Sequence, residues 1–307
     1  MKYIIGMDGG GTNTVCAIAD IEGNVLYKCS GGPSNFLIKG TEVISQNIFS
    51  LIENCVSKLR IKYSEIKIIV IGVTGGGRRE DADHLRQSII ALSNNKGIEF
   101  EKILVESDAL IALEGAFSGR PGSILISGTG SIMFGKDDKE KIYRVGGFGR
   151  IIGDGGSGYS IGRKGLNAMS KQFDGRDEFT EISKLMYDNF NITSAEILIS
   201  EVYRNNFDVA SVAPIVISAA ENNDKIALRI IEEEAEELLL HIESMLKKIN
   251  QPVMNLAFIG GIISRDNIFS RTLKQKISYR VPHVNILEPE NSPEIGAIII
   301  GKNLISA

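Results

Sequence analysis

Seven residues near the start of the chain, from Asp8 to Thr14 (sequence DGGGTNT), have the types and spacing of an anion-binding turn. Glycines leave backbone N–H groups uncovered, so a phosphate can approach them closely. The side chains of Thr12, Asn13 and Thr14 supply further donors. A carboxylate beside such a phosphate is suited to hold Mg²⁺, directly or through water. The segment predicts a phosphate-binding turn with a magnesium-organising acid, Asp8; a plain tight hairpin would use the same glycines.

The elements around this turn are predicted to be strands. Apolar runs from Tyr3 to Met7 and from Val15 to Ala19 flank it, and a third strand is expected from Val25 to Cys29. No Gly-Lys-Ser/Thr sequence follows the glycines, which excludes a Walker loop. A dinucleotide-binding fingerprint would open a helix rather than a second strand. The glycines therefore form the tip of a strand–turn–strand unit.

The same pattern occurs a second time. A strand from Ser123 to Ile126 runs into Ser127-Gly128-Thr129-Gly130-Ser131, and strands from Ile132 to Gly135 and from Ile142 to Val145 follow. Two such tips in one chain indicate an internal duplication rather than two chance hairpin turns. We therefore expect two phosphate-binding hairpins on either side of a cleft between two similar domains.

A glycine-rich loop follows the second tip. Seven glycines stand among the thirteen residues from Gly146 to Gly158. A loop with so few side chains after a phosphate tip is interpreted as shaped around a ligand. Asp154 within it is either the cap of the next helix or an acceptor for sugar hydroxyls. A third glycine turn, Gly260-Gly261, lies between a strand and a helix and would let adenosine lie against the backbone.

Asp108 is the candidate catalytic residue of the first half. It follows a strand from Lys102 to Val105 and precedes a helix from Ala109 to Phe117. A carboxylate at the carboxyl end of a parallel strand could accept a proton from a substrate hydroxyl. The alternative is that Asp108 or Ser107 only caps the helix.

The rest of the chain alternates helices with apolar strands. The first part is predicted as βββαβαβα, an α/β domain with a mixed sheet, and Gly119 to Gly122 is a candidate boundary. The longest helix, about Asp224 to Ile249, has an apolar stripe, and its acidic run from Glu232 to Glu237 is interpreted as a solvated face. The other predicted helices span about 41–58, 80–93, 158–173, 267–277 and 293–304, and the other strands span 67–73, 256–259 and 284–287.

Composition indicates an ordinary globular protein. The chain has 307 residues, 43% apolar and 23% charged, with a net charge of −4. This acidic balance argues against nucleic acid as the main partner. No run approaches the roughly 20 apolar residues of a membrane helix, and no signal peptide is evident, so a cytoplasmic protein without a membrane partner is expected.

The cysteines and histidines give no metal-type pattern. Cys16, Cys29 and Cys55 are an odd set without paired spacing and are interpreted as reduced structural thiols. The three histidines, at positions 84, 241 and 283, share no spacing typical of a metal site either. Catalysis is therefore expected not to use histidine.

Taken in order, these motifs resemble the N-acetylglucosamine kinase and BadF/BadG/BcrA/BcrD-type branch of the actin-like ATPase and sugar kinase superfamily. The series is Asp8-Gly-Gly-Gly-Thr12, Pro33-Ser34-Asn35, Ser107-Asp108-Ala109, Ser127-Gly-Thr-Gly-Ser131, Gly146-Gly147-Phe148-Gly149, Gly153-Asp154-Gly-Gly-Ser157 and Gly260-Gly261. The resemblance implies an α/β fold of two duplicated ribonuclease H-like domains around a central cleft. It places the N-terminal domain at 1–118, with the C-terminal helix of about 292–307 packing back on it, and a larger domain with a helical insertion at 119–291.

The resemblance also implies a role for each matched residue. Asp8 would organise Mg²⁺ through water, and Asp108 would be the catalytic base. The implied ATP-binding residues are Gly9, Gly10, Gly11, Thr12, Asn13, Thr14, Gly128, Thr129, Gly130, Ser131, Ala210, Gly260 and Gly261. The implied sugar-binding residues are Asn35, Gly75, Asp108, Thr129, Gly146, Gly147, Phe148 and Asp154. Relatives often carry Trp where this chain has Phe148, and the chain has no Trp.

The activity implied is transfer of the γ-phosphate of ATP to the 6-hydroxyl of N-acetylglucosamine, with N-acetylmuramic acid as a further acceptor in peptidoglycan recycling. Glucosamine kinase activity is an alternative, and relatives suggest a homodimer. Another alternative is an ATPase that activates a radical dehydratase or reductase, although such proteins hold an iron–sulfur cluster through cysteines that have no counterpart here. A sugar-sensing repressor would need a DNA-binding segment before the first hairpin, where Met1 to Met7 leave no room, and a filament protein would not need Asn35, Asp108 and Asp154.

Overall fold

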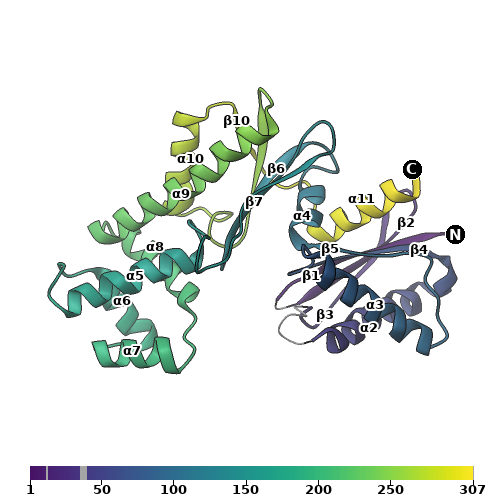
Figure 1. Ribbon diagram of the computed structural model, residues 1–307, viewed down its shortest axis with the longest axis horizontal. Helices are drawn as coiled ribbons and strands as arrows, with labels where there is room; N and C mark the ends of the chain where they lie inside the picture. The colour runs from purple at the N-terminus through teal and green to yellow at the C-terminus, as the bar shows by residue number, and fades with distance from the viewer. Residues whose placement is uncertain (12, 35–39, 307) are drawn as a thin grey trace. The chain divides into compact units, whose positions relative to one another are not determined.

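The computed structural model describes residues 1–11, 13–34 and 40–306, so Thr12 and Asn35 lie outside the described residues. The chain divides into two compact units (Figure 1), residues 1–121 together with 288–307, and residues 122–287. Among the described residues, no helix is long and apolar enough to cross a membrane.

The N-terminal unit is built on a five-stranded mixed sheet of order β3-β2-β1-β4-β5. The first three strands are antiparallel neighbours, and β4 and β5 run parallel to β1. The strands are β1 (Tyr3–Gly9), β2 (Thr14–Asp20), β3 (Val25–Gly31), β4 (Ile66–Val73) and β5 (Ile103–Ser107).

Helices cover both faces of this sheet, because side chains of each strand alternate between faces. Ile5 and Met7 pack with residues of α2 and α3, whereas Ile4 packs with residues of α4 and α11. Figure 1 shows these two helix pairs on opposite sides of the strands. The unit contains α2 (Thr41–Leu59), the short helix η1 (Tyr63–Glu65), α3 (Arg79–Asn95), α4 (Asp108–Ala116) and α11 (Pro293–Ser306).

The C-terminal unit repeats this topology with a five-stranded sheet of order β10-β9-β6-β7-β8. Here β6, β7 and β8 are antiparallel neighbours, while β9 is parallel to β6 and β10 to β9. The strands are β6 (Gly122–Ser127), β7 (Ser131–Lys136), β8 (Ile142–Gly146), β9 (Met254–Ile259) and β10 (Val284–Leu287). The duplicated α/β fold predicted from the two glycine tips is confirmed.

Most helices of this unit lie between β8 and β9 in the chain. They are α5 (Gly158–Phe173), α6 (Glu181–Phe190), α7 (Ala195–Arg204), the short helix η2 (Val209–Val212), α8 (Ala213–Glu221) and α9 (Lys225–Ile249); α10 (Ile268–Arg280) follows β9. The predicted apolar stripe of α9, with Ile231, Leu238 and Ile242, is buried. The interpretation of its acidic run as a solvated face is wrong at Glu234, which is only 1% exposed.

The three cysteines, which have no metal-type spacing in the sequence, come together in the folded unit. The Sγ atoms of Cys16, Cys29 and Cys55 all lie within 4.8 Å of one another. Sequence spacing could not show this, because the three residues come from two strands and a helix that meet only in the folded unit.

Candidate active site

The first glycine hairpin joins β1 to β2. Gly9 pairs with Thr14, and the backbone N–H of Gly10 donates to the Asn13 carbonyl at 3.0 Å. A Cβ added at Gly9 would lie 2.7 Å from Val73 Cγ1, whereas a Cβ at Gly11 would meet no described atom within 4 Å. Gly9 is thus required by packing, and Gly11 is the open position at which backbone can meet a ligand.

Thr14 stabilises this hairpin through its side chain. Its side chain is fully buried, and its hydroxyl donates to the Gly32 carbonyl at 2.7 Å and contacts Ser34 Oγ. This hydroxyl ties the end of β2 to the segment after β3. The Thr14 hydroxyl, which was predicted to donate a hydrogen bond to phosphate, is therefore already engaged inside the unit.

Asp8 lies in β1 one residue before the turn. Burial raises its pKa to about 6, and the charges of Asp108 and Glu294 add to this shift. A nearby cation would offset all three effects, because each disfavours the ionised carboxylate. The oxygen ligand, its burial and the surrounding negative charge therefore fit the requirements of a Mg²⁺-organising group.

Asp108 is held at the start of α4 by two hydrogen bonds. Its Oδ1 accepts from its neighbour Ala109 N–H at 2.8 Å, and its Oδ2 accepts from the Thr74 hydroxyl at 2.8 Å. The cap of α4 is Ser107, whose hydroxyl accepts from Leu110 N–H at 3.2 Å. Asp108 is therefore not the helix cap, and its carboxylate is oriented by Thr74 from the neighbouring strand end.

Thr74 is a functional candidate that sequence reasoning missed. It directly follows β4, whose parallel neighbours are β1, with Asp8 as its penultimate residue, and β5, which Asp108 directly follows. The structure thereby brings Asp8, Thr74, Gly75 and Asp108 to the carboxyl edge of one sheet, where open α/β sheets bind ligands. A hydroxyl between a strand end and three glycines was the available signal.

The second hairpin joins β6 to β7 and repeats the first. The N–H of Gly128 donates to the Gly130 carbonyl at 3.0 Å, and a Cβ at Gly128 would meet nothing described within 4 Å. The carbonyls of Gly128 and Thr129 accept from Gly158 and Tyr159 in the first turn of α5. The positive end of the α5 dipole therefore lies at this tip and favours an anion there.

The glycine loop brings Asp154 against this second tip. Asp154 is 8% exposed, has φ of 61°, and its Oδ1 accepts from Gly149 N–H at 3.1 Å. A Cβ at Gly130 would lie 2.9 Å from its Oδ2. The N-cap of α5 is Ser157, so the alternative that Asp154 caps this helix is wrong.

Glu234 of α9 holds the glycine loop through its backbone. Sequence reasoning missed this residue. Its Oε2 accepts from Gly156 N–H at 2.6 Å, its Oε1 accepts from the Ser160 hydroxyl at 2.9 Å, and Lys164 Nζ lies 2.9 Å away. From the second hairpin, the hydroxyls of Ser127 and Ser131 donate to the carbonyls of Gly156 and Gly155, respectively. These bonds tie the loop to α9 and to the second hairpin.

Gly146 and Gly147 begin the loop where no side chain fits. Both have left-handed φ, and an added Cβ would lie 2.3 Å from His241 and from Ile132, respectively. Arg144 donates to the Gly146 carbonyl at 3.1 Å and to the Gly147 carbonyl, and its guanidinium lies 5.7 Å from the Phe148 ring centroid. Phe148 is 69% exposed and is therefore available to contact a ligand.

The third glycine turn lies beside the second hairpin. A Cβ at Gly260 would lie 2.3 Å from the Ser127 carbonyl, whereas Gly261 meets nothing described within 4 Å. Ala210 comes near the same place, since a Cβ at Gly158 would lie 3.6 Å from the Ala210 Cβ. The structure thus groups the predicted adenosine residues around the second phosphate tip.

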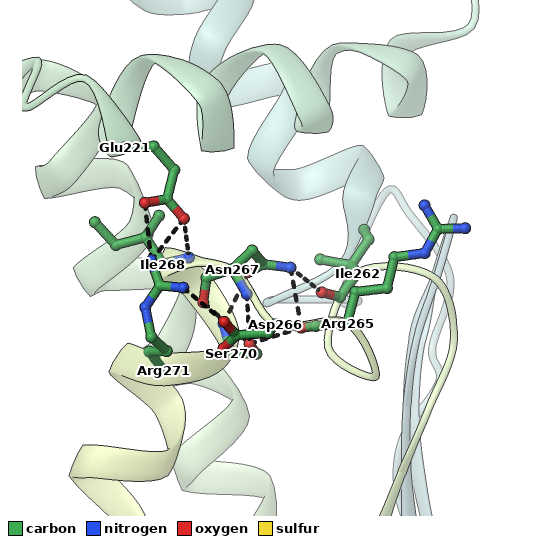
Figure 2. Close-up of polar contacts among 8 residues, drawn as sticks. All are labelled: Glu221, Ile262, Arg265, Asp266, Asn267, Ile268, Ser270 and Arg271. Atoms are coloured by element: carbon green, nitrogen blue, oxygen red, sulfur yellow. Dashed lines mark hydrogen bonds and ion pairs between the residues drawn. The ribbon is translucent and has the colours of Figure 1, made fainter.

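A polar network fixes the chain after this turn, as Figure 2 shows. Asn267 caps α10 by accepting from Ser270 N–H at 3.0 Å and donates to the Ile262 carbonyl at 2.7 Å. Glu221 at the end of α8 accepts from Ile268 N–H and pairs with Arg271. The turn that presents Gly261 is therefore tied to two helices.

Comparison with known proteins finds relatives that align over nearly the whole chain. Residues 5–301 match the BadF/BadG/BcrA/BcrD ATPase family. The chain is 35% identical over 309 residues to the N-acetylmuramic acid/N-acetylglucosamine kinase of Clostridium acetobutylicum, covering 99% of each. It is 28% identical over 317 residues to the N-acetyl-D-glucosamine kinase of Dictyostelium discoideum, covering 98% of each.

Solved structures show the same fold. A protein from Chromobacterium violaceum assigned as an N-acetylglucosamine kinase aligns with a TM-score of 0.75 at 23% identity, covering 98% of this chain and 99% of that one. A glucokinase of the ROK family from Streptomyces griseus aligns with a TM-score of 0.57 at 14% identity, covering 98% of both. At these identities the likeness establishes the architecture.

Proposed function

The chain belongs to the BadF/BadG/BcrA/BcrD ATPase family, and we propose that within it this protein is an ATP-dependent kinase that phosphorylates the 6-hydroxyl of N-acetylglucosamine. Sugar kinase activity follows from two relatives named as amino-sugar kinases that align over nearly the whole chain. The first of them also names N-acetylmuramic acid, which we propose as a second acceptor.

The observation that carries this proposal is the oriented carboxylate of Asp108. Transfer forms a bond from the sugar O6 to the γ-phosphorus, breaks the bond to ADP and releases the hydroxyl proton. We assign that proton to Asp108, whose position is fixed by the Thr74 hydroxyl and by the start of α4. Alignment of the acceptor oxygen is the larger contribution, since phosphoryl transfer needs little covalent help from protein.

The two hairpins are proposed to bind the phosphates of ATP. In the N-terminal unit the open backbone position is Gly11, and in the C-terminal unit it is Gly128, beside the start of α5. We propose that Gly260, Gly261 and Ala210 border the adenosine. Thr12 lies outside the described residues, and its role in phosphate binding remains a prediction.

Mg²⁺ is proposed to be organised by Asp8. The donor is an oxygen ligand of the kind Mg²⁺ prefers, and the negative charges around it favour a cation. The ion would screen charge on the transferred phosphate when bound. Asp8 would hold its water ligands by hydrogen bonds.

The sugar is proposed to contact the glycine loop and the strand ends. In the C-terminal unit these contacts come from Asp154, Thr129, Phe148 and the Gly146-Gly147 backbone. In the N-terminal unit they come from Gly75 with Asp108, and Asn35 remains a prediction outside the described residues. Asp154 supports this assignment because one of its oxygens accepts from loop backbone while the other faces the second hairpin.

A coupled ADP-release assay with Mg²⁺ and ATP tests the proposal. N-acetylglucosamine, N-acetylmuramic acid, glucosamine, glucose and no sugar form the panel. Turnover with the N-acetylated sugars is expected. Turnover restricted to glucosamine would favour the activity of the Vibrio cholerae glucosamine kinase GspK, to which the chain is 24% identical over 267 residues. ADP release without sugar would instead favour an activator ATPase.

The cellular setting follows from the proposed substrates. N-acetylmuramic acid is a sugar of the bacterial cell wall, so the enzyme would serve amino-sugar salvage in peptidoglycan recycling within the cytoplasm. We also propose a homodimer. Light scattering coupled to size-exclusion chromatography measures that mass directly.

A further inference from the structure

All three cysteines of the chain converge on one place in the N-terminal unit. Cys16 of β2 and Cys29 of β3 are direct register partners, and Cys55 of α2 lies over them. The Sγ atoms of Cys16 and Cys55 are 3.6 Å apart, and those of Cys29 and Cys55 are 3.8 Å apart. None of these residues belongs to the proposed kinase machinery.

The thiols are held in place by packing. Cys16 and Cys55 are fully buried in the apolar cluster between the sheet and α2, while Cys29 is partly exposed. Leu51 of α2 packs tightly on β3, since a Cβ at Gly31 would lie 3.1 Å from it. Two thiols are therefore fixed from inside, and the third offers a route from solvent.

The Cys16–Cys55 and Cys29–Cys55 separations are close to those of sulfur atoms that share one metal ion, and the Cys16 and Cys29 sulfurs lie within 4.8 Å of each other. With metal–sulfur bonds of about 2.3 Å, thiolates around one ion lie roughly 3.8–4.0 Å apart. Thiolate ligands select soft ions such as Cu⁺ and Zn²⁺ over Mg²⁺ and Ca²⁺. We propose that Cys16, Cys29 and Cys55 form a binding site for one soft, thiophilic metal ion with a filled d shell.

A three-thiol site explains the arrangement better than a disulfide does. A disulfide joins only two sulfurs and requires an oxidant, so it would not account for the position of the third thiol. A metal ion uses all three without electron transfer. Because each thiol loses its proton on binding, affinity for the ion rises with pH.

The test is a titration of the reduced, chelator-treated full chain with Cd²⁺ and, under anaerobic conditions, with Cu⁺ in competition with a chromophoric chelator. One ion per chain, ultraviolet charge-transfer absorption from sulfur to Cd²⁺ and a higher Tm are expected, since ligands of the native state stabilise it. Mg²⁺ should produce none of these changes.

Variants separate binding from general stability. Cys29→Ser, at the partly exposed position, should fold with near-normal Tm and weaken binding of Cd²⁺ at least tenfold. Val56→Ala removes a buried methyl pair next to Cys55 without removing a thiol, so it should lower Tm yet retain stoichiometric binding. Equal binding by Cys29→Ser and the parent, or no charge-transfer absorption in the parent, would overturn the proposal. Formation of a disulfide by two of the thiols in the oxidised protein, together with no metal binding by the reduced protein, would overturn it as well.

Discussion

Two aspartates in the N-terminal unit have environments suited to different tasks. Asp8 is partly buried, and its burial and the charges of Asp108 and Glu294 raise its pKa to about 6. Asp108 instead accepts two hydrogen bonds, from Thr74 and from the first turn of α4. The first environment favours a nearby cation, and the second holds a carboxylate in one orientation.

Removing the proposed base should stop chemistry while sparing ATP binding. Asp108→Asn is expected to lower kcat by roughly 10²–10⁴ with little change in the KM for ATP. Thr74→Val should lower kcat about tenfold, because a hydrogen bond to a charged group contributes about 1.5 kcal/mol or more. Thr74→Ser keeps the hydroxyl and is the matched control. Near-normal turnover by Asp108→Asn would remove Asp108 from the mechanism.

The ionised Asp8 carboxylate should lower the stability of the fold while supporting Mg²⁺-dependent turnover. Its folded-state pKa is above the ordinary value of 3.8, so the ionised form destabilises the fold, and this penalty appears as pH rises from about 4 to about 6. At about 1.4 kcal/mol per pKa unit, the penalty is at most about 3 kcal/mol above pH 6. Without Mg²⁺ and nucleotide, Asp8→Asn should therefore have a higher Tm than the parent at pH 7.5, and the difference should shrink toward pH 4. The same variant should lose Mg²⁺-dependent turnover. Identical melting curves across this range would contradict the assignment.

At the scale of single residues, sequence reasoning found the acids but not their partners. Asp8 and Asp108 could be named because each follows an apolar strand and adjoins glycines or a helix start. Thr74 could not be paired with Asp108, because the hydrogen bond joins residues 34 positions apart on neighbouring strands. The engaged hydroxyl of Thr14 was equally invisible, since Gly32 approaches it only in the folded sheet.

At the scale of elements, two kinds of glycine form the site. Some are required by packing, such as Gly260, and others face open space, such as Gly128. The composition of a glycine-rich stretch does not separate the two. The two kinds are separated only by the atoms that surround each glycine in the folded structure.

This difference gives a paired prediction for the second hairpin. Gly128→Ala should fold with a free energy of unfolding within about 0.5 kcal/mol of the parent and raise the KM for ATP, because its Cβ meets only the space proposed for phosphate. Gly260→Ala should lower the Tm strongly, since its φ is 103° and its Cβ would collide with the Ser127 carbonyl. Thermal melts and ATP saturation curves measure both effects. Unchanged ATP binding by Gly128→Ala would place the phosphates elsewhere.

The glycine loop should depend on one buried acid of α9. Glu234→Gln is expected to lower Tm and raise the KM for the sugar, because it weakens the bond to Gly156 N–H and leaves Lys164 without its buried partner. Glu232→Gln changes an exposed member of the same acidic run, paired with Lys276, and is the control. If the two variants behave alike in Tm and in KM, Glu234 does not anchor the loop.

The signal for Glu234 was present in the helical period. It lies three residues after Ile231 and four before Leu238, on the buried stripe. Reading the acidic residues as one block hid this. The strands were predicted more reliably, because buried strands form continuous apolar runs that end in glycine turns.

At the scale of the whole molecule, the duplicated topology is the firmest inference. Two copies of an antiparallel three-strand meander followed by parallel strands could be foreseen from the repeated glycine tips. The return of α11 to the N-terminal unit could not be derived from local pattern and came only from the family resemblance. The choice among N-acetylglucosamine, N-acetylmuramic acid and glucosamine depends on loop side chains such as Phe148, which no periodicity encodes.

The measurement that tests the central claim most directly is identification of the product by phosphorus and proton NMR. The enzyme is incubated with Mg²⁺, ATP and N-acetylglucosamine, with the 6-deoxy sugar as a parallel substrate. The account predicts a phosphomonoester whose phosphorus couples to the two protons on C6, formed in equal amount to ADP, and no ADP from the 6-deoxy sugar. Phosphate on another hydroxyl, or ADP released to the same extent with the 6-deoxy sugar, would contradict it.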